Sequence, residues 1–149
     1  MAPRSTHLCQ FGRARPRVAV GSVGSPAVAR RRIDPSEGES AVGAWLAGEA
    51  DRRSVATAVR YALQTLTDRA PGHSVEVRVP PAGVTQVIEG PRHTRGTPPN
   101  VIETDAETFL ALATGRLMWD EAVASGAVAA SGQRADLGSL LPLWGPPVG

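Results

Sequence analysis

The sequence predicts an α+β fold in which a small, mainly antiparallel sheet is covered by a layer of short helices. Two changes of pattern support this prediction. Apolar residues recur at helical spacing before residue 70, alternate with polar residues from residue 75, and return to helical spacing after residue 105. Strands flanked by runs of helices are typical of α+β domains whose helices gather on one face of the sheet.

The first two helices are expected after Asp34 and after Asp51. Asp34 can cap the first helix, with Pro35 at its first position and Glu37 three residues after the cap, and Gly48 is expected to end it. The second helix has the clearest apolar stripe, with spacings of three and four residues. The members of this stripe are Val55, Ala58, Val59, Ala62, Leu63 and Leu66. One face of the second helix is therefore expected to be buried.

Four strands are expected. Valines alternate with charged residues over 75–79, which predicts a strand with one solvent-facing side. The reversal at 80–83 leads into 84–89, and these two strands are expected to pair as an antiparallel hairpin. The remaining strands are expected over 100–104 and 127–131.

Three short helices are expected in the C-terminal half. Thr104 and Glu107 have the spacing of a capping box for the first of them, which Gly115 would end. The second is expected over Trp119–Ser125 and the third over Ala135–Leu141. The predicted order of elements is therefore ααβββααβα.

One folded domain is expected over residues 30–142, preceded by a disordered basic extension (1–29) and followed by a flexible tail rich in Pro and Gly (143–149). The chain has 16 arginines, no lysine and 14 carboxylates, and residues 1–33 hold seven of the arginines and no acid. The body that follows is therefore acidic. No apolar run approaches the roughly 20 residues of a membrane-spanning helix, so no integral membrane segment is expected.

Several classes of site lack their sequence signals. Cys9 is the only cysteine, which rules out an internal disulfide and favours a cytoplasmic location. His7, His73 and His93 show no paired spacing for a metal site, and the sequence has neither a nucleophile elbow nor a phosphate loop. Arg30–Arg32 lack interleaved aromatic residues, so no nucleic-acid partner is expected. No cofactor and no metal are expected.

Residues 89–100 hold the densest group of candidate binding side chains. Arg92 and Arg95 have guanidinium groups that suit a carboxylate or a phosphate, and His93 lies between them. A strand connection with solvated charges, whose Thr and Asn side chains satisfy nearby backbone groups, explains the same residues. Both interpretations stay open from the sequence.

The pattern from Thr104 onward carries a family resemblance. The segment 104–117 ends in Gly-Arg-Leu and is followed by Trp-Asp-Glu-Ala, Gly-Ala-Val, Ser-Gly and the apolar stretch 137–141. These residues resemble the C-terminal half of sterol carrier protein domains. Together with the unusual segment 89–100, the whole of 32–141 is similar to a compact actinobacterial branch of that family.

This resemblance implies an apolar cavity between the sheet and the helix layer. It also implies a non-enzymatic binding or carrier module whose partner is a lipid or another apolar small molecule. Periodicity indicates which residues would form the wall, although plain core packing explains the same residues. The expected ligand-binding residues are Val59, Leu63, Leu66, Arg92, His93, Arg95, Phe109, Leu112, Leu117, Trp119 and Val123.

Two other functions are compatible with the sequence. The first is an accessory or substrate-holding domain for a partner enzyme, which would use the segment 89–100 as its working surface. The second is acid–base catalysis centred on His93, Glu89 and Glu103, for which the sequence supplies no supporting nucleophile or metal site.

Overall fold

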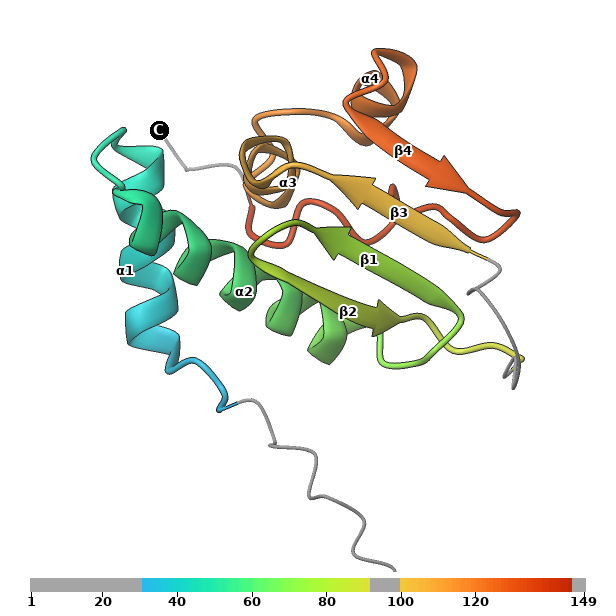
Figure 1. Ribbon diagram of the computed structural model, residues 1–149, viewed down its shortest axis with the longest axis horizontal. Coiled ribbons are helices and arrows are strands. Elements are labelled where there is room, and N and C mark those ends of the chain that lie inside the picture. The colour runs from blue at the N-terminus through green and yellow to red at the C-terminus, as the bar shows by residue number, and fades with distance from the viewer. Residues whose placement is uncertain (1–30, 92–99, 146–149) are drawn as a thin grey trace, which may run out of the picture. The chain divides into compact units, whose positions relative to one another are not determined.

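The computed structural model describes residues 31–91 and 100–145, and the structural statements below concern these residues. The elements follow the order α1 (Pro35–Leu46), α2 (Arg52–Arg69), β1 (Val75–Val79), β2 (Gly83–Val87), β3 (Val101–Thr104), α3 (Ala106–Ala113), α4 (Trp119–Ala124) and β4 (Val128–Ser131). The predicted α+β fold is confirmed (Figure 1). The expected basic extension 1–29, the centre of the segment 89–100 and the last four residues lie outside the described residues.

The four strands form one mixed sheet with the order β2-β1-β3-β4. The β1–β2 hairpin is antiparallel, as predicted, and β3–β4 is antiparallel too, whereas β1 and β3 run parallel. β3 therefore lies beside β1 and not beside β2, which precedes it in the chain.

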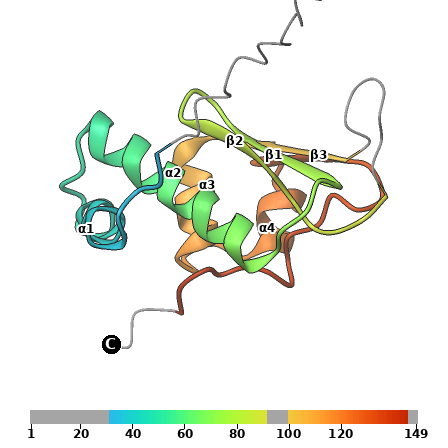
Figure 2. The same cartoon turned by 90° about the horizontal axis from the view of Figure 1, so that it is seen from below.

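One face of the sheet is covered and the other is open. Val75, Val77 and Val79 of β1 are completely buried, as the alternation predicts, and they face α2 and α3. Figure 2 shows the sheet nearly edge-on, with α2, α3 and α4 on the same side of it. On the opposite face, the side chains of Arg78 and Glu76 form an ion pair with an Nε–Oε1 distance of 2.5 Å.

The apolar stripe of α2 forms the centre of the core. Ala58, Val59, Ala62 and Leu66 are completely buried, and Leu63 is 4% exposed. Burial of such a stripe is the main favourable contribution to folding, at roughly 25 cal/mol per Å² of apolar surface. In the described parts of the chain, no helix combines the length and the apolar character that crossing a membrane requires.

The start of α3 corrects one prediction. Asp105, and not Thr104, is the N-cap, and its carboxylate accepts the backbone N–H of Thr108 at 2.9 Å. Thr104 stays in β3, where its hydroxyl donates to the carbonyl of Ala127 at 2.9 Å. The pairing of β3 with β4 therefore keeps Thr104 extended, and the next residue with a short acceptor side chain caps the helix.

The prediction of a helix over 135–141 is also wrong, because residues 138–140 form a turn and the residues on either side are irregular. The carboxylate of Asp136 accepts the backbone N–H of Gly138 at 2.7 Å, which stabilises a local turn in place of a helical bond. The packed chain also continues beyond the expected boundary at residue 142. Leu143 is only 4% exposed, and its N–H donates to the carbonyl of Ala113 at 2.8 Å.

Candidate functional site

The C-terminal strap, defined as residues 136–144, runs along the helices on the side away from the sheet (Figure 2). Arg69, the last residue of α2, holds it there. One of its guanidinium nitrogens donates to the carbonyls of Leu140 and Pro142 at 2.9 and 2.8 Å, and the other donates to the carbonyl of Leu143 at 2.5 Å. A single charged side chain therefore binds three backbone carbonyls of an irregular segment.

Aromatic packing fixes the end of the strap. The rings of Trp144 and Tyr61 are stacked, with centroids 5.7 Å apart and an interplanar angle of 12°. Tyr61 also packs against Gly38 of α1, where an added Cβ would lie 2.2 Å from the ring. The close approach of α1 to α2 therefore requires glycine at this position.

A groove lies where the end of α3, the start of α4 and the strap meet, and its volume is about 290 Å³. Leu112 and Trp119 are 1% and 9% exposed and form its floor, whereas the side chain of Met118 at its rim is 67% exposed. The complete lining is Leu112, Gly115, Leu117, Met118, Trp119, Asp120, Asp136, Gly138, Ser139, Leu141 and Pro142. The lining of the groove therefore combines apolar side chains with polar groups in comparable amounts.

The turn after α3 positions the groove residues. Gly115 has a φ of +75°, a left-handed conformation that favours glycine, and it ends α3 as predicted. Arg116 then turns away from the groove, because its guanidinium donates to the carbonyl of Leu46 at 2.9 Å and lies 5.3 Å from the ring centroid of Trp45. Its neighbour Leu117 lines the groove.

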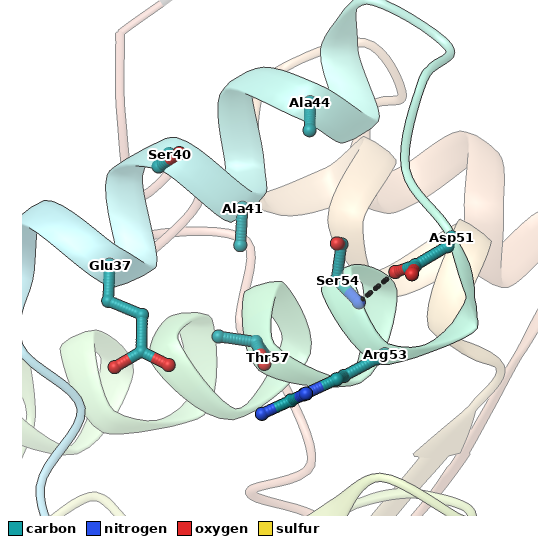
Figure 3. A pocket seen from close by; sticks show the side chains of 8 residues that line it. All are labelled: Glu37, Ser40, Ala41, Ala44, Asp51, Arg53, Ser54 and Thr57. Carbon is teal, nitrogen blue, oxygen red and sulfur yellow. Dashed lines mark hydrogen bonds between the residues drawn. The ribbon is translucent and has the colours of Figure 1, made fainter.

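A second cleft of about 300 Å³ lies between α1 and α2. Its lining consists of Glu37, Ser40, Ala41, Ala44, Asp51, Arg53, Ser54 and Thr57 (Figure 3). Asp51 caps α2 by accepting the N–H of Ser54 at 2.7 Å, and this hydrogen bond lowers the pKa of its carboxyl. The lining of the cleft includes no large apolar side chain, and the carboxylate of Asp51 is already engaged as the N-cap of α2. The groove is therefore the better candidate for an apolar ligand.

The residues that the sequence assigned to the ligand fall into four groups. Leu112, Leu117 and Trp119 line the groove together. The members that lie in the packed core and line neither the groove nor the second cleft are Val59, Leu63, Leu66 and Phe109. Val123 faces solvent on α4 and is 39% exposed, because the six-residue helix buries only Trp119 and Ala122. Arg92, His93 and Arg95 lie outside the described residues.

Sequence reasoning missed the polar and strap residues of the groove. These are Asp120 and the strap residues Asp136, Gly138, Ser139, Leu141 and Pro142, and the exposed Met118 was missed as well. A helix over 135–141 would have placed the strap residues differently. One signal in the sequence was an aspartate two residues before a glycine, which is typical of a turn in which the carboxylate binds the backbone.

The segment 89–100 has a structural role at its last residue, Asn100. Asn100 is 6% exposed, and its amide nitrogen donates to the carbonyl of Ser74 at 2.8 Å. Its amide oxygen accepts the N–H of Arg134 at 3.0 Å. The Asn100 side chain therefore satisfies backbone groups, but these lie 26 and 34 residues away in the sequence and are not the nearby groups that the sequence interpretation names.

Comparison with known proteins identifies the family. The family described as bacterial SCP ortholog, where SCP denotes sterol carrier protein, matches residues 51–143, which is more than half of the chain. The chain belongs to this family. No curated protein matches the sequence. The whole lining of the groove, from Leu112 to Pro142, falls inside the matched range, whereas the α1 side of the second cleft precedes it. In this bacterial SCP orthologue, the groove is thus part of the family domain.

Proposed function

We propose that this bacterial SCP orthologue is a non-enzymatic binding or carrier module and that its groove takes an apolar, lipid-like ligand. The observation that carries the proposal is the meeting of Leu112, Leu117 and Trp119 in one groove. These residues were assigned to an apolar ligand from the sequence, and membership of a sterol carrier protein family supports the same chemistry.

The shape of the groove supports a single apolar chain. Its volume of about 290 Å³ is near the lower end of the range for small-molecule sites, roughly 300–1,000 Å³. Leu112 and Trp119 are already almost completely buried, so a bound alkyl chain would remove water mainly from its own surface and from the exposed Met118 at the rim. Binding and release of such a chain require no chemical step, which is why the proposed role is non-enzymatic.

Binding can be tested with Nile red, an uncharged apolar dye whose fluorescence increases in an apolar site. We expect the parent protein to enhance its fluorescence in a saturable manner. Ser139→Phe places a large ring at an exposed position of the lining and should reduce dye binding at least about tenfold, because the ring competes for the groove.

The matched control is Ser131→Phe. Ser131 is exposed at the end of β4 and does not line the groove, so this variant introduces the same ring without blocking the site. Dye binding by this control should equal that of the parent. A parent protein that binds no Nile red, or equal losses in both variants, would contradict the proposed function.

A further inference from the structure

The polar groups of the groove carry charge of one sign. Asp120 and Asp136 both line it, and its lining includes no arginine, lysine or histidine. Among residues 31–91 and 100–145, the ion pairs are Arg32–Asp68 and Arg78–Glu76, so neither groove aspartate is paired with a described cation. The charged rim of the groove therefore attracts a cation and repels an anion.

The guanidinium groups of Arg69 and Arg116, on elements beside the groove, are already engaged. Arg69 donates three hydrogen bonds to carbonyls of the strap. Arg116 donates to the carbonyl of Leu46 and lies over Trp45, on the α1 side of α3. Neither side chain lines the groove. A bound carboxylate would thus meet two aspartates without a guanidinium from either residue to compensate.

Gly138 lies between the carboxylate of Asp136 and the indole ring of Trp119. A Cβ atom at this position would lie 3.0 Å from Cδ1 of Trp119 and 3.1 Å from Oδ1 of Asp136. The indole ring and the carboxylate therefore border the same small space, which the glycine leaves free. Oδ1 already accepts the N–H of Gly138 at 2.7 Å, which fixes the orientation of the carboxylate and leaves Oδ2 for a ligand.

We infer that the groove selects single-chain amphiphiles with an ammonium headgroup over those with a carboxylate headgroup, and that Asp120 and Asp136 determine this selectivity. This inference rests on the proposed function and names the class of its ligand. The alkyl chain lies on Leu112 and Trp119, and the ammonium group lies at the rim beside the two carboxylates. The volume of about 290 Å³ suits one chain better than the two chains of a membrane phospholipid.

The test compares three ligands that share one alkyl chain: decylammonium, decanol and decanoate. Each is titrated against protein loaded with Nile red, below its aggregation concentration and at neutral pH. We expect decylammonium to displace the dye at least about tenfold more effectively than decanoate, with decanol between them. The preference should decrease as sodium chloride is added, because exposed charges are screened.

The double variant Asp120→Asn/Asp136→Asn removes both charges and keeps the side-chain shapes. It should bind decanol like the parent protein and should lose most of the preference for decylammonium. The matched control is Glu121→Gln, which removes one charge from the same helix at a position that does not line the groove. This control should keep the preference.

The outcomes separate the inference from the function on which it rests. If decanol binds but decylammonium binds no better than decanoate, the inference is wrong and the proposed function stands. Retention of the full preference by the double variant, or its loss in Glu121→Gln, would also overturn the inference. If none of the three ligands displaces the dye and the dye itself does not bind, both proposals are wrong.

Discussion

Aspartate caps connect single side chains to the stability of whole helices. Asp34, Asp51 and Asp105 each accept a backbone N–H at the start of a helix. The pKa of the Asp105 carboxyl is lowered from its ordinary value of 3.8, first by the hydrogen bond from the Thr108 N–H. The folded protein therefore binds a proton at this group less readily than the unfolded chain does.

We predict that Asp105→Ala destabilises the protein by about 1 kcal/mol at neutral pH. A carboxyl group with a lowered pKa in the folded state contributes stability above its unfolded pKa, and this contribution is lost as the pH falls through the folded pKa. The difference between parent and variant should therefore shrink below about pH 4. Urea unfolding at neutral and acidic pH measures it.

Glu39→Ala serves as the control for this prediction, because Glu39 is an exposed acid within α1 that does not cap the helix. Its stability should stay within about 0.5 kcal/mol of the parent. A difference for Asp105→Ala that does not change with pH would refute the charged-cap explanation.

Glycine stabilises the end of a helix where φ is positive, but it destabilises the interior of a helix. Gly126 follows α4 with a φ of +77°, as the sequence predicts for a residue that reverses the chain. Gly43 lies within α1 and is exposed. An added Cβ would meet nothing within 4 Å at either position, so only the backbone conformation distinguishes them.

We predict opposite effects for the same substitution at these two glycines. Gly126→Ala should destabilise the protein by about 1 kcal/mol, because a side chain is strained in the left-handed region. Gly43→Ala should stabilise it by about 0.5–1 kcal/mol, because alanine loses less entropy within a helix. Thermal unfolding of both variants tests the prediction, and a shift of the same sign in both would contradict it.

Among the described residues, the packing of the strap on the helices depends on contacts between parts of the chain that are far apart in the sequence. The strap forms one side of the groove, and Arg69 joins it to α2 across more than 70 residues. Without the guanidinium group, the carbonyls of Leu140, Pro142 and Leu143 lose their donor. Two of these hydrogen bonds are exposed and one is part-buried, so water replaces part of what the carbonyls lose, and the cost comes from three charged hydrogen bonds lost together.

We predict that Arg69→Ala lowers the free energy of unfolding by about 1–3 kcal/mol. Nile red binding should weaken as well, because Leu141 and Pro142 line the groove from the strap. Arg60→Ala on the same helix is the control and should stay within about 0.5 kcal/mol of the parent, since the Arg60 guanidinium donates to Thr57 of its own helix and not to the strap. Equal urea midpoints for the two variants would show that Arg69 does not secure the strap.

Much of the fold was predictable because its signals are local. The stripe of α2, the alternating valines of β1 and the glycines that end α3 and α4 each depend on the spacing of a few neighbouring residues. Leu112, Leu117 and Trp119 could be assigned together to a ligand site from the sequence, because they lie close together in the chain. Side chains in one short segment need little tertiary information to be placed near one another.

Tertiary contacts decided the rest. Residues 135–141 have an apolar pattern compatible with a helix, but the bond from Gly138 to Asp136 and the donors of Arg69 stabilise turns there instead. Periodicity shows that Leu66 and Leu112 are apolar-face residues, and both belong to the core, yet only packing places Leu112 at the floor of a groove as well. The charge of that groove arises because the strap and α4 each contribute a carboxylate to its lining, Asp136 and Asp120, and the meeting of such separate elements is not encoded in any local pattern.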